Sequence, residues 1–282
     1  MLLEAFSRVL PVLLLVGLGV LIRRQGFLRA TTIDDLRKLV LTITLPAALF
    51  LAMLKVEVES QYVVIVGAVF GACVVMLLAA PYKRRPAGIE SGSMPNLMAG
   101  FEAGMLGYAL YGALFGTAAL YRFAIVDIGQ VLFVFFILAP VVMRRTSGVG
   151  VPLRESIVGF VRTPVIIAIV AGIAGGAIGL EETLRGFDLG DALLVTFELL
   201  AALTTPLIAI VLGYSTSLRL GALSDPMRTL AVRMPIWVLL AIAFNVFVVD
   251  ALLGLDRLFQ AAVMTMAILP PPFVVPLYMA RA

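Results

Sequence analysis

Long apolar stretches, separated by short segments that carry most of the charges, follow one another along the whole sequence. Each stretch has about 20 residues, the length that an α-helix needs to cross the hydrocarbon core of a bilayer. The pattern predicts nine membrane-spanning helices, at approximately residues 3–22, 37–54, 61–81, 93–115, 121–143, 158–180, 191–214, 229–249 and 258–280. No connecting segment is long enough for a separate soluble domain. We therefore expect an all-α polytopic membrane protein.

The composition supports this prediction and narrows the chemistry. Hydrophobic residues make up 62% of the 282 residues and charged residues 13%, and the mean hydropathy is +1.11. The chain has no histidine and one cysteine, Cys73, which excludes an intramolecular disulfide and most histidine or thiolate metal sites. We expect no metal site, no cofactor and no nucleic-acid partner. Residues 1–24 have no small-residue cleavage site and end in two arginines, so we expect a retained span.

Lysine and arginine are distributed unequally between the two sides of the predicted spans. One side carries 16 of these residues and the other carries 4. The richer side includes the segments around Arg23, Lys83, Arg144 and Arg219, and Arg233 is counted with the last of these. Because positive charge is retained on the cytoplasmic side, the count predicts a multi-pass protein of the cell (inner) membrane with its N-terminus outside.

Similar features recur five spans apart. They are a Pro-Val start to an apolar run at Pro11 and Pro164, a Thr-x-Pro motif from Thr44 and from Thr204, and interruptions in the spans 93–115 and 258–280. An odd number of spans per repeat inverts the second copy. The sequence thus predicts a first five-helix repeat at 1–143, a cytoplasmic linker at 144–157, and a second repeat at 158–282 that lacks its last helix.

The two interrupted spans indicate where a solute would bind. The first contains several glycines, and the second contains the run Pro270–Pro272 followed by Pro276. Paired interrupted helices in inverted repeats are typical of the binding site of a secondary transporter, because the broken helices leave backbone groups available to a ligand. The alternative is a pair of simple packing kinks, since glycine and proline are common in membrane helices.

Polar side chains inside the apolar stretches are the candidates for chemistry, because a charge at mid-membrane costs about 2.5–3.5 kcal/mol on insertion scales. Glu102 is the strongest candidate. It lies about 13 Å from the cytoplasmic end of its span at the rise of an α-helix, among Gly100, Gly104 and Gly107. Asp127 is followed one turn later by Gln130.

Each of the other polar residues has a structural interpretation. Asp127 could equally reach water or pair with Arg122. Glu198 is interpreted as a hydrogen-bonding residue near the surface, Asn245 as an interhelical hydrogen bonder, and Trp237 as an interfacial anchor at the cytoplasmic boundary.

We expect a binding site at the crossing of the two interrupted spans. The substrate-binding residues predicted there are Glu102, Gly104, Gly107, Asn96, Pro270, Pro271 and Pro272, and the residues predicted to bind a coupling ion are Glu102, Asp127 and Gln130. No histidine-dependent catalytic pair and no phosphate-binding loop occur in the sequence, so we do not expect an enzyme. A hydrolase built on Glu102 and Asp127 is the weakest alternative.

Four segments carry a resemblance to a known family. They are LVLTITLPAALF from Leu39, GFEAGMLGYALYGALFG from Gly100, FAIVDIGQVLFVF from Phe123, and the region around Pro270. The pattern resembles the auxin efflux carrier family of the bile/arsenite/riboflavin transporter superfamily, over nearly the whole chain. The resemblance implies a ten-helix inverted repeat in which helices 4 and 9 are broken and cross at mid-membrane. It also implies a scaffold of spans 1, 2, 6 and 7 and a transport domain that moves like an elevator.

The family transports organic anions such as malonate and malate in bacteria and auxin in plants, so the resemblance implies a small carboxylate as substrate. Three departures stand out. The family typically has Asn at Glu102 and Pro at Ala109, and its tenth helix is absent here. An acidic residue at an anion site repels the substrate unless it is protonated or neutralised by a cation. We therefore hypothesise that Glu102 couples transport to a proton, with sodium as the other candidate.

The sequence thus predicts a secondary active transporter of a small organic anion in the lipid bilayer, with alternating access of the elevator type. A non-transporting membrane receptor or scaffold is the alternative. Whether the chain forms a homodimer is left open.

Overall fold

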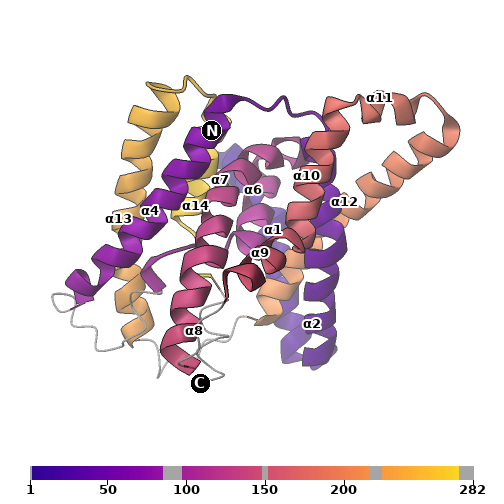
Figure 1. Ribbon diagram of the computed structural model, residues 1–282. Coiled ribbons are helices and arrows are strands. Elements are labelled where there is room, and N and C mark those ends of the chain that lie inside the picture. The colour runs from indigo at the N-terminus through magenta and orange to yellow at the C-terminus, as the bar shows by residue number, and fades with distance from the viewer. Residues whose placement is uncertain (1, 85–96, 148–151, 216–223, 273–282) are drawn as a thin grey trace. The chain divides into compact units, whose positions relative to one another are not determined.

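The computed structural model describes residues 2–84, 97–147, 152–215 and 224–272, and every regular element in these ranges is a helix (Figure 1). Within these described ranges, five helical stretches are long and apolar enough to cross a membrane: Ala30–Met53, Ser60–Ala79, Thr117–Arg144, Asp188–Ser215 and Arg228–Asp250. A sixth is obtained if the bent pair Leu153–Val161 and Pro164–Ala177 counts as one span. The chain is therefore an all-α membrane protein, as the apolar pattern predicts.

The predicted number of nine spans and the inverted repeat remain predictions. The spans at 93–115 and 258–280, as well as the linker at 144–157, extend beyond the described residues. One predicted span differs clearly, because the stretch 158–180 bends by 60° between Val161 and Pro164. Proline disfavours a helical conformation in the residue before it, and Thr163 is accordingly extended, with φ −66° and ψ 123°.

The helices divide into two compact units, which do not coincide with the predicted halves 1–143 and 158–282. Unit 1 comprises Met1–Val58, Gly104–Ala124 and Arg162–Leu218, and unit 2 comprises Glu59–Ala103, Ile125–Val161 and Arg219–Ala282. Each unit therefore takes segments from both halves. Unit 1 contains the spans 1, 2, 6 and 7, which the family resemblance assigns to a scaffold.

Close helix packing at glycines organises unit 1. Its helical elements are α1 (Leu2–Arg24), α2 (Ala30–Leu39), the π-helical turn η1 (Val40–Thr44), α3 (Leu45–Met53), α6 (Tyr108–Phe115), the 3₁₀ turn η3 (Thr117–Ala119), α10 (Pro164–Ala177), α11 (Leu180–Arg185) and α12 (Asp188–Ser215). A Cβ atom at Gly19 of α1 would collide with the backbone of α12, and one at Gly213 of α12 would collide with the backbone of α1. Small residues let membrane helices approach to backbone contact, so these two glycines hold α1 against α12.

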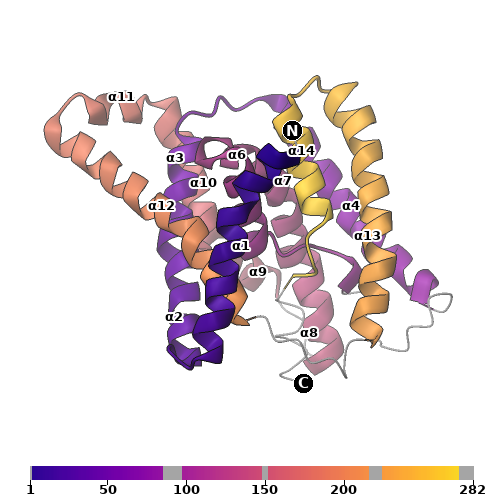
Figure 2. The same cartoon turned by 180° about the vertical axis from the view of Figure 1, so that it is seen from behind.

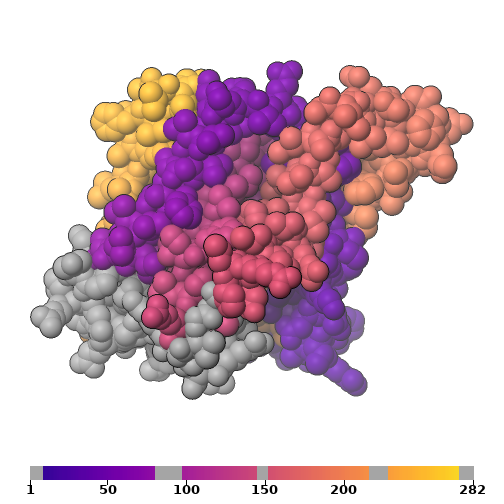
Figure 3. Space-filling model, in the orientation of Figure 1, coloured from indigo at the N-terminus to yellow at the C-terminus, as the bar shows by residue number. Residues whose placement is uncertain are grey.

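Unit 2 carries the interrupted segments. Its helical elements are α4 (Ser60–Arg84), most of α7 (Leu120–Phe133), the π-helical turn η4 (Val134–Leu138), α8 (Ala139–Ser147), α9 (Leu153–Val161), α13 (Ser224–Phe244), the π-helical turn η6 (Asn245–Asp250) and α14 (Arg257–Ala267). The helices α13 and α14 lie side by side in both views (Figures 1 and 2). One face of α4 lies at the surface in the space-filling view (Figure 3).

Hydrogen bonds fix α14 within unit 2. Asp256 caps its N-terminus by accepting a hydrogen bond from the Phe259 N–H at 3.0 Å. The Asn245 Nδ2 atom donates to the Gln260 carbonyl at 2.9 Å, which joins η6 to α14. The interpretation of Asn245 as an interhelical hydrogen bonder is thereby confirmed.

Candidate functional site

Two irregular segments meet inside unit 2. In the first, residues 99–102 are not helical and precede the π-helical turn η2 (Ala103–Gly107); in the second, α14 ends at Ala267 and residues 268–272 are irregular. The Glu102 N–H donates a hydrogen bond to the Pro270 carbonyl at 2.9 Å. Three consecutive prolines lack backbone N–H groups and cannot continue a helix. The two segments are therefore in direct contact, and we call the place where they meet the crossing.

Gly100 is suited to this crossing for two reasons. Its φ of +76° lies in the left-handed region, which a residue with a Cβ atom rarely adopts. In addition, a Cβ atom there would lie 3.3 Å from the Pro272 Cγ atom. The glycine thus allows both the turn and the close approach of the second segment.

A buried guanidinium group joins the two segments. Arg233 of α13 is 0% exposed, and its two Nη atoms donate hydrogen bonds to four backbone carbonyls. The acceptors are Leu97 at 2.9 Å and Met98 at 2.8 Å from Nη1, and Gly100 at 2.6 Å and Leu269 at 3.2 Å from Nη2. We call this arrangement the Arg233 clamp.

The Arg233 clamp has a clear electrostatic basis. The last carbonyls of a helix have no partner within that helix, and the C-terminal end of a helix favours a positive charge. Leu97 and Met98 are helical and directly precede the first irregular segment, and Leu269 follows the end of α14. One arginine therefore binds carbonyls at the end of the helix before the first irregular segment and just beyond the end of α14, which its planar fork of donors makes possible.

Aromatic side chains enclose the Arg233 clamp. The guanidinium carbon lies 4.9 Å from the centre of the Phe101 ring, and the Phe101 and Trp237 rings make an edge-to-face contact at 4.5 Å. The Trp237 indole N–H donates to the Met98 carbonyl at 2.9 Å. Arg233 Nε is buried and has no hydrogen-bond partner among the described residues.

The sequence patterns did not predict the roles of these two residues. Counting charges by side places Arg233 among the cytoplasmic charges, and Trp237 is predicted to be an interfacial anchor, whereas both are buried. The interpretation of Trp237 was wrong, because its indole N–H bonds to backbone at the crossing rather than to the membrane interface. The position of Arg233 in the sequence could have revealed its role, because it lies inside the predicted span 229–249, where a charge is costly. Trp237 lies one helical turn later on the same face of that span.

The predicted coupling residues are buried beside the first irregular segment. The exposed fractions of Glu102, Asp127 and Gln130 are 9%, 3% and 4%. The Gln130 Nε2 atom donates to the Phe101 carbonyl at 3.0 Å and to the Asp127 Oδ1 atom at 3.2 Å. Gln130 thus ties α7 to the segment that contains Glu102, and the burial of Asp127 argues against its reaching water.

Of the four other residues predicted to bind substrate, those that the structure describes make no hydrogen bond between the two irregular segments. Gly104 and Gly107 lie in η2 within unit 1, and the hydrogen bonds that join the two irregular segments come from other residues. Pro271 lies in the second irregular segment between two residues that contact the first. Asn96 lies outside the described residues.

Glu198 belongs to a surface network rather than to the crossing. It is half-exposed and accepts a hydrogen bond from Arg185 at 3.1 Å, and Glu181 accepts another at 3.2 Å. The hydrogen bond with Glu198 has the largest effect on Arg185, and together with the bond to Glu181 it raises the pKa of Arg185 above its usual value. The interpretation of Glu198 as a hydrogen-bonding residue near the surface is confirmed.

In the part of the chain that the structure describes, acidic and thiol side chains form no group of three that could hold a metal ion. Comparison of the chain with protein-family models gives no match, and comparison with curated proteins gives none. The resemblance to the auxin efflux carrier family therefore stays a prediction.

Proposed function

We propose that the chain is a secondary active transporter that carries a small organic anion, a carboxylate such as malonate, malate or an auxin-like compound, across the cell membrane. Transport is of the elevator type and is coupled to a proton through Glu102. One observation carries the proposal: two irregular segments cross within apolar helices, beside a buried arginine and a buried carboxyl group.

The depth of the crossing supports a solute site. Helix α14 has 11 residues before it ends at Ala267, which corresponds to about 16 Å at 1.5 Å per residue. The hydrocarbon core is about 30 Å thick, so the interruption falls near mid-depth if α14 begins at the membrane surface. Irregular backbone at this depth is tolerated only where it is buried in protein or lines a cavity. We interpret these irregular segments as a solute site, in which their backbone groups bind the solute.

The charges support an anion with a coupled proton. The hydrogen bonds from Arg233 to carbonyls of both segments fix a positive charge beside the crossing. Glu102 lies in the same segment, and its ionised form would oppose an incoming carboxylate. A protonated Glu102 would not, so anion and proton would enter together.

The division into two units supports an elevator mechanism. Unit 2 contains both irregular segments, whereas unit 1 contains the four spans that a scaffold would provide. An elevator mechanism requires such a division, because the substrate must move with one body past another.

The test is uptake by purified protein in proteoliposomes. We expect uptake of one or more small radiolabelled carboxylates that is faster with an inward proton gradient and unaffected by sodium. Glu102→Gln should abolish the dependence on pH while the protein remains folded. Glu198→Gln is the matched control, because Glu198 is half-exposed and lies outside the crossing, and it should behave like the unmodified protein.

Two results would count against the proposal. Uptake whose pH dependence is the same in Glu102→Gln would remove the coupling role of Glu102. Absence of uptake for every carboxylate would remove the transport function. In the second case thermal unfolding separates the alternatives. A solute at 100 times its Kd stabilises the protein by about 2.7 kcal/mol, so stabilisation without uptake indicates a receptor and no stabilisation indicates a scaffold.

A further inference from the structure

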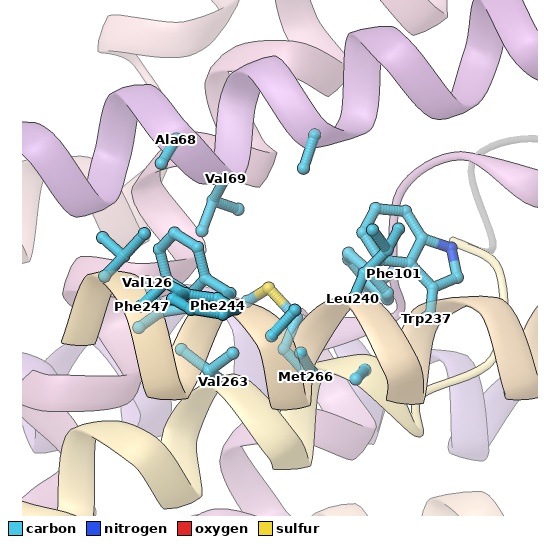
Figure 4. Close-up of a pocket in the computed structure, with 15 residues that line it drawn as sticks. Ala68, Val69, Phe101, Val126, Trp237, Leu240, Phe244, Phe247, Val263 and Met266 are labelled. Carbon is cyan, nitrogen blue, oxygen red and sulfur yellow. The ribbon is translucent and has the colours of Figure 1, made fainter. Parts of the chain in front are cut away.

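An apolar cavity of about 330 Å³ lies within unit 2, between α4, α13 and α14. Figure 4 shows Ala68 and Val69 of α4 facing Leu240 and Phe244 of α13 across it, with Met266 of α14 on a third side. The wall nearest the crossing is formed by Phe101 and Trp237. The cavity is therefore separated from the Arg233 clamp by one aromatic layer.

The chemistry of the lining restricts the occupant to hydrocarbon. All 15 lining residues are apolar or aromatic. Their one polar side-chain atom is the Trp237 indole nitrogen, which points away from the cavity in Figure 4 and already donates to the Met98 carbonyl. A polar solute would therefore lose its hydrogen bonds with water and gain none from these side chains, at a cost of a few kcal/mol for each group.

The size of the cavity favours occupancy. Engineered apolar cavities of about 150 Å³ stay free of water and bind benzene, and this cavity is about twice as large. The atoms that line an empty space lose dispersion contacts. A hydrocarbon segment of several methylene groups fits the volume and restores those contacts.

The position of the cavity identifies the source of that hydrocarbon. Ala68 lies eight residues after the start of α4 and Val263 six residues after the start of α14, which is about 9–12 Å along each helix. Both helices start on the side that the charge pattern predicts to be outside. The cavity thus lies at the depth of the acyl chains of that leaflet.

The rim of the cavity continues into a lipid-facing surface. Two of its lining residues, Leu240 and Phe247, are 45% and 70% exposed. Leu239 and Ile242, on the same part of α13, are 66% and 47% exposed. In a membrane protein such a face is covered by lipid tails, which are as apolar as leucine.

We propose that this cavity is a binding site for one acyl chain of a phospholipid from the outer leaflet. The bound chain packs against Phe101 and Trp237 and so supports the aromatic wall of the Arg233 clamp from the membrane side. The crossing is then stabilised by a lipid as well as by protein contacts. This inference does not depend on transport.

Trp237 makes the site directly observable, because it is the one tryptophan in the chain. The full chain is reconstituted into bilayers of phosphatidylcholine that carries bromine atoms at the middle of one acyl chain, and tryptophan fluorescence is compared with that in unbrominated bilayers. We expect strong quenching by the brominated chains. We expect no quenching by acrylamide added to the aqueous phase.

A pair of neighbouring substitutions separates lipid in the cavity from lipid around the protein. Ala68→Phe fills the cavity, whereas Gly67→Phe adds the same ring where a Cβ atom meets nothing within 4 Å. We expect quenching to fall at least twofold in Ala68→Phe and to stay unchanged in Gly67→Phe. If Ala68→Phe does not fold, Ala243→Phe fills the cavity from α13, and the adjacent Ile242→Phe is its control.

Three outcomes would overturn the proposal. Equal quenching in the filled and control variants would show that the bromine atoms act from outside the cavity. Weak quenching of the unmodified protein would show that protein occupies the cavity. Quenching by acrylamide would show that the cavity holds water. None of these results bears on solute uptake, so the lipid site and the proposed transport function can fail separately.

Discussion

Arg233→Met tests whether the Arg233 clamp holds the two irregular segments together. Methionine keeps a long unbranched side chain but removes the guanidinium donors. Four carbonyls lose a hydrogen bond from Arg233, and of these the Met98 carbonyl keeps its bond from the Trp237 indole. Three carbonyls are thus left without that donor, those of Gly100 and Leu269 in a buried environment and that of Leu97 half-buried.

The expected loss of stability is the difference of two large contributions. A buried polar group without a partner costs about 1–3 kcal/mol, so the two buried carbonyls cost about 2–6 kcal/mol and the half-buried Leu97 carbonyl adds a smaller amount. Removal of a buried charge offsets several kcal/mol of this. We expect the free energy of opening of the crossing to fall by about 3 kcal/mol, which corresponds to an increase of about 100-fold in the open population.

Cys73 reports this opening. It is the one cysteine of the chain, it is 0% exposed, and its thiol lies beside the Gly100 backbone and close to Arg233. In detergent solution the rate of its reaction with a thiol reagent measures the population of locally opened protein. We expect this rate to rise about 100-fold in Arg233→Met.

Two further variants make the result specific. Arg233→Lys keeps the charge but replaces the planar fork with a compact ammonium group, so we expect an intermediate increase of about 10-fold in the reaction rate. Arg228→Met removes an exposed arginine from the same helix and should leave the rate unchanged. A rate in Arg233→Met within about threefold of the unmodified protein, a change of less than about 0.7 kcal/mol, would refute the reasoning.

Three further predictions concern backbone and packing. Gly100→Ala should cost about 1–3 kcal/mol, because alanine is strained at positive φ and would crowd Pro272; the Cys73 reaction rate should rise at least fivefold, and an unchanged rate would contradict the assigned turn. Gly19→Leu should lower the melting temperature by at least 5 °C because the side chain meets the α12 backbone, whereas Gly17→Leu, with nothing within 4 Å of its Cβ atom, should not; equal effects would contradict the close packing. Thr44→Val should be neutral or stabilising by up to about 1 kcal/mol, because the buried hydroxyl has no partner among the described residues; a fall in the denaturation midpoint would reveal one.

The membrane class could be predicted from the sequence because the lengths of apolar runs are fixed by the thickness of a bilayer. The interruption near Pro270 could also be predicted, since a proline breaks the helix in which it lies. Pro164 gives the same local indication of a bend. The bend was not predicted, because an apolar run of about 20 residues was interpreted as one continuous span. The apolar runs alone could not predict the division into units, because they identify helices without identifying their partners. The grouping of spans 1, 2, 6 and 7 came from the family resemblance instead.

The Arg233 clamp illustrates what sequence reasoning could not supply. Its acceptors are backbone carbonyls, which every residue has, so nothing in the sequence marks Leu97 or Leu269 as partners of an arginine more than 30 residues away. Counting charges by side also treats each arginine as hydrated. A cation inside a predicted span should instead prompt a search for helix ends that it could reach.

The contact between α1 and α12 sets a time scale for biosynthesis. Arg23 and Tyr214, which are joined by a hydrogen bond at the end of this contact, are separated by 191 residues. At about 5–20 residues per second, the ribosome needs roughly 10–40 s to deliver the second helix after the first. During that interval Gly19 of α1 lacks the α12 backbone on which it packs, and this position is open to lipids or to insertion factors. Delayed emergence of α12 should therefore increase quality-control degradation of the nascent chain.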